Sequence, residues 1–440
     1  MNFYRNKAQN MNKFICCLAF SAMAATGAYA QGTNSPYSQY GFGDLTDQSV
    51  GFNKGMSGVA QGFRKGNEVN PANPASYSAV DSLTFLFDGG FSGQYTRFKE
   101  NGTKLNGKNG GFDYVMGLFR VTRNFGVSFG VMPFSNIGYN YSSKERFEDV
   151  NTTITTTHNG SGGISQLYLG AGWRIIKPLS VGFNLSYLWG DYNMNITTSS
   201  TSDINTLSKQ YLASMSSYKL DIGVQAELPL NKDAQIVLGA TFSPGHKFNG
   251  DPRCLIIHRN TAINKSDTTS YSAGDDLELP TAWTVGVAYN HGKKLRVGAD
   301  FQMQHWAGIQ YPDYVKAASN GSADYVMREG LLRDCQKVNV GAEWTPNPSG
   351  RKYLQHVRYR IGAGYTTPYY NINGQQGPKE FHASIGFGIP ILNSINNRSI
   401  VNISAQWARR SAENLITENS FRINIGITFN ERWFAKWKVE

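Results

Sequence analysis

Residues 421–430 read FRINIGITFN, and this stretch decides the fold class of the chain. The odd-numbered positions, from Phe421 to Phe429, are all apolar, whereas the even-numbered positions carry Arg, Asn, Gly, Thr and Asn. Successive side chains of a strand point to opposite faces, so this period of two predicts a strand with one apolar face and one polar or small face. In a soluble sheet the apolar face would form the core, whereas in a membrane barrel it faces lipid.

The same alternation recurs in fourteen segments from residue 82 onward. Most of them reach the ~9–11 residues that a tilted strand needs to cross a bilayer. The mean strand of a soluble protein is shorter, at about five or six residues. The predicted strands are 82–98, 110–122, 125–142, 162–176, 179–199, 215–230, 234–250, 281–291, 294–306, 332–346, 354–368, 379–390, 399–409 and 419–430.

The gaps between these segments alternate in length. Short turns lie at 122–124, 177–178, 231–233 and 291–293, with two modest ones at 347–353 and 391–398. Longer connections lie between them, at 99–109, 143–161, 200–214, 251–280, 307–331, 369–378 and 410–418. Short periplasmic turns and long outer loops are typical of outer-membrane barrels. We therefore predict an all-β protein, a 14-stranded antiparallel transmembrane β-barrel in the outer membrane, with both termini in the periplasm.

The first thirty residues have the three parts of a secretory signal. A basic start that includes Arg5 precedes a short apolar run, and Ala28-Tyr29-Ala30 forms a cleavage box. We predict a signal peptide over 1–30, and the sequence leaves open whether it starts at Met1 or Met11. Beyond residue 30 no apolar run approaches the ~18 residues of a membrane helix, which excludes a helical inner-membrane protein.

The formal net charge is +11, which raises the question of nucleic-acid binding. The basic residues are scattered rather than clustered, so we interpret them as lumen and rim charges near acidic lipid headgroups. We expect outer-membrane lipid as a partner and no nucleic acid. After the signal only Cys254 and Cys335 remain, and the sequence does not decide whether they pair.

Fourteen strands enclose more space than side chains can fill, since about eight strands is the filled case. Residues 31–81 lack the alternation and are rich in Gly, Ser and Asn, so we predict that they plug the lumen of a barrel formed by 82–430. Residues 431–440 are either the end of the last strand or a Trp-rich periplasmic tail. Three Gly-x-Gly pairs lie inside strands with no helix after them, so they are interpreted as lumen-face positions that leave room for the plug, not as phosphate loops. The pairs are Gly170/Gly172, Gly362/Gly364 and Gly386/Gly388.

The plug segment carries an Asn-Pro-Ala motif twice in tandem, at 70–72 and 73–75, after a Gly-Met-Ser-Gly stretch at 55–58. It resembles the N-terminal hatch of the FadL/TodX family of outer-membrane transporters. Pro133-Phe134, in the third predicted strand, is similar to the Pro-Phe element where that family's third strand is kinked and the wall opens sideways. Proline cannot donate to a strand ladder, so Pro133 also predicts a local break on physical grounds.

The resemblance implies passive uptake of hydrophobic small molecules through a hatch-gated lumen with a lateral exit. It implies hatch or gating roles for Asn70, Pro71, Ala72, Asn73, Pro74 and Ala75, and a lateral opening marked by Pro133 and Phe134. The alternative is a non-transporting scaffold or accessory subunit of an outer-membrane protein secretion or assembly complex, since relatives of this family also serve as scaffold barrels. Charges on the presumed lumen face either pin the hatch through ion pairs or make the lumen hostile to apolar ligands. They are Arg174, Asp221, Glu227, Arg296, Asp300, Lys337, Glu343, Arg358, Arg360, His382 and Arg422.

Segment 307–331 holds an aromatic and aliphatic set that is expected to form a short helix in an outer loop. The set could line a ligand entry groove, form a docking surface or pack over the barrel mouth. It comprises Tyr311, Tyr314, Val315, Tyr325, Val326, Leu331 and Leu332.

We do not expect an enzyme, a metal site or a cofactor. The G-x-S-x-G match at 126–130 lies inside the predicted strand 125–142 and so forms no nucleophile elbow, and none of the seven histidines forms a pair with helical metal-ligand spacing. The acidic run at 275–278 is interpreted as a solvated loop rather than a Ca²⁺ site.

Overall fold

The computed structural model describes residues 32–431 apart from 83, 149–150, 204, 275, 317–322 and 392–398. The predicted signal peptide and residues 432–440 of the predicted tail lie outside the described residues. Within the described part of the chain, no helix is both long and apolar enough to cross a membrane.

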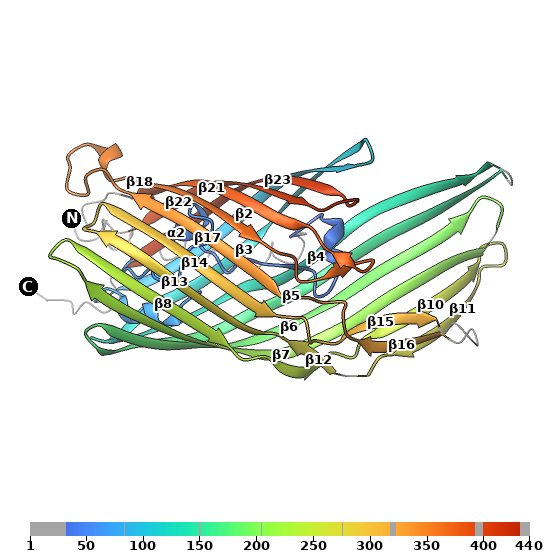
Figure 1. Ribbon diagram of the computed structural model, residues 1–440, viewed down its shortest axis with the longest axis horizontal. Coiled ribbons are helices and arrows are strands. Elements are labelled where there is room, and N and C mark those ends of the chain that lie inside the picture. Colours follow the sequence, from blue (N-terminus) through green and yellow to red (C-terminus); the bar gives the residue numbers. More distant parts are fainter. Residues whose placement is uncertain are drawn as a thin grey trace, which may run out of the picture.

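Fourteen antiparallel strands form a closed barrel, which confirms the predicted fold class (Figure 1). The barrel closes because the first wall strand, β2, pairs with both β3 and the last strand, β23. The wall strands are β2 (Phe85–Glu100), β3 (Thr103–Thr122), β4 (Phe125–Phe147), β5 (Thr152–Ile176), β6 (Leu179–Ser200), β7 (Asn205–Pro229), β8 (Ala234–Ser243), β13 (Thr281–His291), β14 (Leu295–His305), β17 (Cys335–Trp344), β18 (Arg358–Thr366), β21 (Lys379–Pro390), β22 (Ile400–Ser411) and β23 (Thr417–Glu431).

The remaining elements lie inside the barrel or in its loops. Those in the lumen are η1 (Pro36–Gln39), β1 (Asp44–Leu45), α2 (Gly51–Lys54) and η2 (Pro74–Ala79). Those in the connections are β9 (His246–Asn249), β10 (Arg253–Asn260), β11 (Lys265–Ser272), β12 (Asp276–Leu279), β15 (Tyr311–Lys316), β16 (Ala323–Arg328), η4 (Tyr353–Gln355), β19 (Asn371–Ile372) and β20 (Gln375–Gln376).

The two faces of the wall have opposite polarity. On β6, Phe183 and Leu185 are 49% and 53% exposed on the outside, whereas Asn184 and Ser186 are buried toward the lumen. The apolar face therefore points away from the protein interior, the reverse of a soluble sheet and the arrangement of a barrel whose outer belt contacts lipid.

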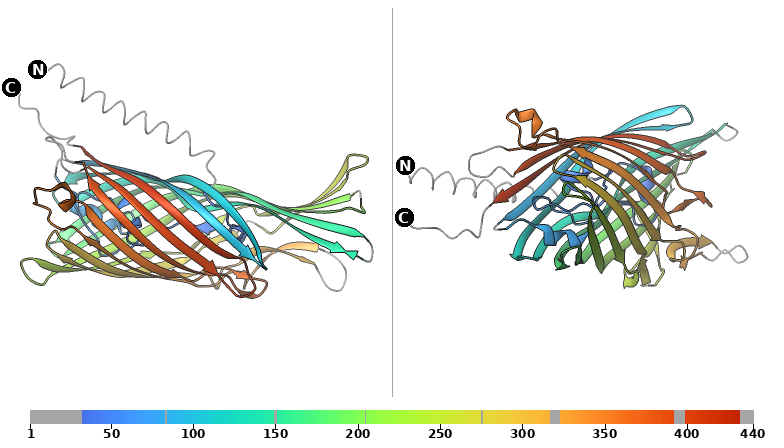
Figure 2. Two further views of the ribbon diagram at one scale, coloured as in Figure 1. Left: turned by 90° about the horizontal axis from the view of Figure 1, so that it is seen from above. Right: turned by 60° about the vertical axis from the view of Figure 1, so that its left-hand side comes forward.

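The two ends of the barrel differ (Figure 2). We call the end with the short connections the turn end; the start of β2 and the end of β23 lie there, with Phe85 paired to Glu431. At the other, loop end, β4 to β7 run beyond the other wall strands, and the β10–β11 hairpin extends this projecting sheet by pairing with β7 (Figure 1).

Three of the predicted long loops are wrong. Segments 99–109, 143–161 and 200–214 are mostly strand, because β2–β3, β4–β5 and β6–β7 continue their pairing almost to the connecting turn. Past a bilayer both faces of a strand meet water, so the alternation that revealed the strand disappears while its ladder continues.

Other connections also differ from expectation. The predicted strand 234–250 is two strands, since Pro244 interrupts it after β8. Segment 251–280 contains β10, β11 and β12 rather than open loop. Segment 307–331 forms the β15–β16 hairpin instead of a short helix, in keeping with its Tyr and Val content.

Candidate functional site

The segment from 32 to 82, here the lumenal segment, lies inside the barrel and contacts the wall on several sides. Its largest apolar side chains are fully buried, with Phe42, Val50, Met56 and Tyr77 all at 0% exposure. Such complete burial inside a barrel of fourteen strands means that the segment occupies the lumen.

The tandem Asn-Pro-Ala motif folds the lumenal segment onto itself and onto the wall. The Asn70 amide donates to the carbonyls of Ala60 and Phe63 at 2.8 and 2.9 Å. The Asn73 amide donates to the Gln61 carbonyl at 3.1 Å and to the carbonyl of Val224 in β7 at 3.2 Å. The two asparagines therefore tie the motif to residues 60–63 and to the barrel.

The intervening motif residues complete this arrangement. The carbonyl of Pro71 accepts from Asn184 of β6 at 2.9 Å, and that of Ala72 accepts from Gln61 at 3.2 Å. Pro74 opens η2, whose N-cap is Asn73, and the amide of Ala75 donates to the Asn73 side chain at 3.2 Å. Proline suits the first turn of a helix because its missing N–H needs no partner there.

Where η2 and the residues around it contact the wall, the wall positions are glycines. Adjacent strands place Gly126, Gly172, Gly182 and Gly223 opposite one another in register, and Gly239 lies on β8. A Cβ at Gly172 or Gly182 would lie 2.4 Å from Pro74 atoms, and one at Gly239 would lie 2.0 Å from the Gln61 carbonyl oxygen. We call these five glycines the glycine floor. The lumenal backbone reaches the wall only because no side chain stands there.

Glycines on the opposite side receive the Gly-Met-Ser-Gly stretch. A Cβ at Gly362 would lie 2.3 Å from the backbone of Met56, and one at Gly386 would lie 2.8 Å from Gly55. One member of each Gly-x-Gly pair noted in the sequence therefore contacts the lumenal segment.

At the turn end, Glu68 of the lumenal segment is held by arginines of the wall. Both its oxygens accept from Arg296 of β14, at 2.8 and 2.9 Å, and one accepts from Arg358 of β18 at 2.5 Å. Burial alone would raise the pKa of Glu68, but the positive charges of Arg296, Lys65 and Arg358 outweigh burial and lower it to about 2. Glu68 therefore stays ionised and paired at neutral pH.

Six of the predicted lumen-face charges contact the lumenal segment, so the pinning interpretation describes them. Arg296 and Arg358 bind Glu68, Glu343 lies 3.7 Å from Lys65, Lys337 binds Asp47 at 3.1 Å, Glu227 binds Arg64 at 3.2 Å, and Asp300 accepts from the amides of Ala60 and Gln61. The other five pair with wall residues instead: Arg174 with Glu227, Asp221 with Lys219, Arg360 with Glu343, His382 with Glu380, and Arg422 with Gln94.

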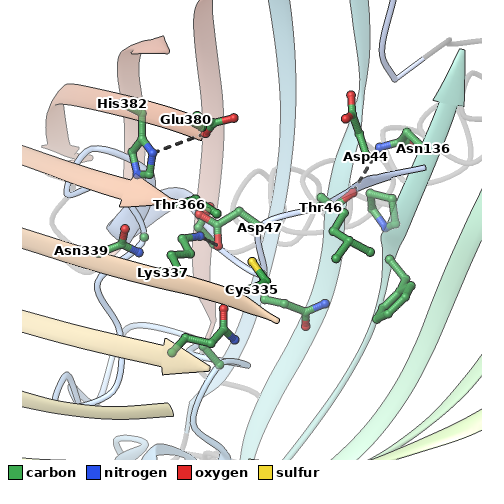
Figure 3. Close-up of a pocket in the computed structure, with 18 of the residues that line it drawn as sticks. Asp44, Thr46, Asp47, Asn136, Cys335, Lys337, Asn339, Thr366, Glu380 and His382 are labelled. Carbon is green, nitrogen blue, oxygen red and sulfur yellow. Dashed lines mark hydrogen bonds and ion pairs between the residues drawn. The ribbon is translucent and has the colours of Figure 1, made fainter. Parts of the chain in front are cut away.

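A cavity of about 360 Å³ remains between the lumenal segment and the wall. Figure 3 shows Asp47 beside Lys337 in its lining, with His382 beside Glu380 and Asn339 nearby. The lining mixes ionised and amide side chains with apolar groups that include Phe112, Phe134 and Trp306. Many of its ionised groups are paired, as Lys337 is with Asp47 and Arg410 is with Glu380. Placing an apolar molecule against these ionised groups would remove their hydration without replacing it.

Aromatic side chains cover the lumen at the loop end. Phe42 lies 5.7 Å from Trp306 and 5.4 Å from Tyr311, centroid to centroid, and the Tyr311 hydroxyl donates to the Gly41 carbonyl at 2.6 Å. Tyr325 and Leu332 are buried as well, at 3% exposure each. Tyr311 and Leu332 thus pack over the barrel mouth, whereas Tyr325 packs against Tyr211 of β7 in the projecting sheet.

The wall has a seam between β3 and β4. In the described strands their ladder ends at Val131, and toward the loop end β3 pairs only with β2. The register of β4 against β5 shifts after Pro133, where the proline predicted a break. Just beyond, β1 of the lumenal segment pairs with β4, and the Phe134 carbonyl accepts from the Thr46 amide at 2.9 Å. The lumenal segment therefore supplies a short strand at the β4 edge that β3 has left.

Sequence reasoning missed the charged residues of the lumenal segment itself and most of the glycine floor. The sequence could have identified the charged residues, since Glu68 and Arg64 lie within a Gly- and Asn-rich stretch that is predicted to be buried. Cys254 and Cys335 are both buried and free. Among the described residues, no group of His, Cys, Asp and Glu could hold a metal ion.

Solved structures with a similar fold are hydrocarbon and related channels. The Pseudomonas putida toluene transporter TodX matches with a TM-score of 0.61 at 13% identity, over 89% of this chain and 100% of that one. A Pseudomonas aeruginosa FadL homologue gives 0.60 at 10% identity, over 88% and 99%, and the CymD monoaromatic hydrocarbon channel gives 0.57 at 12%, over 88% and 98%. At these identities the likeness is one of fold, so the fold alone supports the FadL/TodX resemblance of the sequence.

Family membership comes from the sequence as a whole. No protein with a curated description matches the chain. The sequence model of one family, BamG, matches residues 11–440, nearly the full length. The chain therefore belongs to the BamG family.

Proposed function

We propose that this chain is a closed outer-membrane barrel, with its termini in the periplasm, that acts as a non-transporting scaffold or accessory subunit of a protein secretion or assembly complex. The observation that carries the proposal is the fixation of the lumenal segment at three levels. Glu68 holds it at the turn end, the glycine floor holds its middle, and the Phe42 cluster holds it at the loop end.

A passage for small molecules would have to break these contacts together. Releasing Glu68 leaves the buried Arg358 without its carboxylate and Arg296 with Glu343 alone, and breaking a buried ion pair costs about 3–5 kcal/mol. Ionised side chains line part of the space that remains, and they would lose hydration against an apolar ligand. Both points favour a barrel that stays closed.

The exterior offers surfaces that a scaffold needs. The projecting sheet of β4 to β7 with β10 and β11 extends past the barrel at the loop end (Figure 2). A small molecule can cross the barrel wall without such a sheet, whereas a stable contact with another protein needs an exposed surface of sufficient area. Membership of the BamG family is compatible with this proposal.

Gentle purification from native membranes tests the proposal, with co-purifying proteins and extracted lipids both identified. We expect a stoichiometric protein complex and no fatty acid or similar small molecule in the lumen. A lone barrel that carries such a ligand would contradict the scaffold role.

A disulfide that locks the lumenal segment sharpens the test. The hydroxyls of Ser57 and Ser384 lie 3.0 Å apart, so the double variant S57C/S384C can join the segment to β21. We expect the oxidised double variant to keep its partners and its cellular role. The single variant S57C is the matched control, and loss of function that a reductant reverses would show that the segment must move.

Passive uptake of hydrophobic molecules is the second candidate, and the seam at Pro133 favours it. The wall there is closed by only a short lumenal strand, β1. If uptake is the function, oxidised S57C/S384C will lose uptake of a radiolabelled fatty acid or aromatic hydrocarbon, and S57C alone will not.

A further inference from the structure

The turns at the turn end carry mostly positive charge. Five of them are fully described, and each contains at least one exposed Lys or Arg. Together they hold seven cations against a single carboxylate, Asp233. The cations, here the cationic ring, are Arg123, Lys177, Lys232, Lys293, Lys294, Arg351 and Lys352.

Among the described residues these cations have no partner of opposite charge. Within the ranges that the structure describes, none of the seven lies within ion-pair distance of a carboxylate. The loop end differs, because its loops carry both signs and pair them: Arg253 with Asp251, Arg328 with Asp313, and Lys247 with Asp276. The charge imbalance is therefore a property of one rim of the barrel.

Exposed apolar side chains lie immediately inside this ring on the outer wall. Ile176, directly before Lys177, is 56% exposed, and Leu230, two residues before Lys232, is 58% exposed. Trp344 ends β17 at 52% exposure, and Leu354 follows the Arg351-Lys352 pair at 69%. A basic residue that follows an outward apolar one matches the order of phosphate and acyl layers at a bilayer surface.

We propose that the cationic ring binds the phosphate groups of anionic phospholipids in the leaflet at the turn end. The inference rests on the proposed membrane location and adds a specific lipid partner to it. The even spread of cations over five turns favours a lipid annulus, because a single protein partner would cover one arc of the rim. Charged headgroups attract exposed Lys and Arg, whereas zwitterionic headgroups do so much less.

Tryptophan quenching tests the proposal with the full chain in vesicles. Trp173 and Trp344 lie next to the turn end and are each 52% exposed, so lipids carrying bromine on their acyl chains will quench them on contact. We expect brominated phosphatidylglycerol to outcompete brominated phosphatidylcholine for this surface by roughly fivefold, the effect of about one Lys or Arg at a charged bilayer. High salt will abolish the preference.

A charge-matched pair of variants assigns the preference to the ring. The turn-end variant K177Q/K232Q/K293Q/K294Q keeps three cations of the ring and should lose most of the preference, while the loop-end variant K99Q/K104Q/K144Q/K265Q, with the same loss of four charges, should keep it. Equal quenching of the unaltered chain by both lipids would overturn the proposal, as would a preference that the turn-end variant keeps in full. If the chain shows no lipid preference, and the turn-end variant loses a partner protein in native preparations, the ring binds an acidic protein and the lipid proposal is wrong.

Flotation separates this proposal from the membrane location on which it rests. A chain that does not float with vesicles would refute the membrane barrel itself. A chain that floats and shows no lipid preference refutes only the binding of anionic lipid by the ring.

Discussion

The lumenal segment meets two different kinds of wall. Over β4 to β8 it rests on the glycine floor, where its backbone lies against strands that have no side chain. Over β14, β17 and β18 it is held by charges, chiefly Arg296 and Arg358 on Glu68, with Asp300 on the amides of Ala60 and Gln61. Close packing dominates on the first side, where Glu227 of β7 also pairs with Arg64, and ion pairs dominate on the second, where Gly362 of β18 also receives the Met56 backbone.

The two kinds of contact are expected to respond differently to mutation and to pH. Close packing against glycine is lost when any atom is added, and it does not depend on pH. Ion pairs in a buried site are lost when one partner is removed or neutralised, because the remaining charge is left without hydration. The two walls can therefore be disturbed separately, and hydrogen exchange of the amides in 55–75 reports whether the segment has loosened.

The largest effect should come from Glu68→Gln. The substitution keeps the shape of the side chain but leaves the buried Arg358 without its anion and Arg296 with Glu343 alone, which should cost about 3–5 kcal/mol of the free energy that holds the segment in place. Amides near the turn end should exchange faster first. Replacement of an exposed glutamate, Glu145→Gln, is the control, and equal protection in both variants would mean that the ion pairs do not hold the segment.

Lowering the pH should weaken the attachment of the segment in the unaltered chain, by at most as much free energy as Glu68→Gln does. The pKa of Glu68 inside the barrel, about 2, lies below its ordinary value of 4.5. Its contribution is therefore complete above pH 4.5 and disappears as the pH falls from 4.5 toward 2. Exchange measured across this range in Glu68→Gln should show a smaller acid response than in the unaltered chain. A response of the same size would place the acid effect elsewhere.

The sequence predicts much of the wall because the bilayer imposes its pattern. Strands 281–291 and 379–390 agree with β13 and β21 at both ends, since one face of each meets lipid and the other meets the lumen. The parts of β5 to β7 that project at the loop end were not predicted as strands, because both faces of these strands are polar there. The lumenal contacts escaped for another reason: Glu68 and Arg296 are 228 positions apart, and only the closed barrel brings them together.

On the glycine floor, Gly239→Val should have the next largest effect. Its Cβ would lie 2.0 Å from the Gln61 carbonyl oxygen, so the lumenal backbone must move away. Overpacking of this kind costs about 1–3 kcal/mol, and the upper end is expected because the obstacle is backbone. Gly93→Val is the matched control, because no atom lies within 4 Å of the added Cβ at that strand position. Unchanged exchange in Gly239→Val would mean that the segment has room to shift on the floor.

Asn73 attaches the segment by hydrogen bonds on the side of the glycine floor, and its replacement should have the smallest effect. Asn73→Ala removes the N-cap of η2 and the bonds to the carbonyls of Gln61 and Val224, at a cost of about 1–2 kcal/mol. Asn73→Ser keeps a cap acceptor but loses the amide donors, so it should lie between Asn73→Ala and the unaltered chain.

The exposed Asn106→Ala is the control for Asn73. If Asn73→Ser equals Asn73→Ala, the donors to the wall carry the effect, and the motif serves mainly to attach the segment to β7. If Asn73→Ser equals the unaltered chain, the cap carries it, and the motif serves mainly to shape η2. An effect of Asn73→Ala larger than that of Glu68→Gln would reverse the order of the two walls and make packing on the glycine side the dominant attachment.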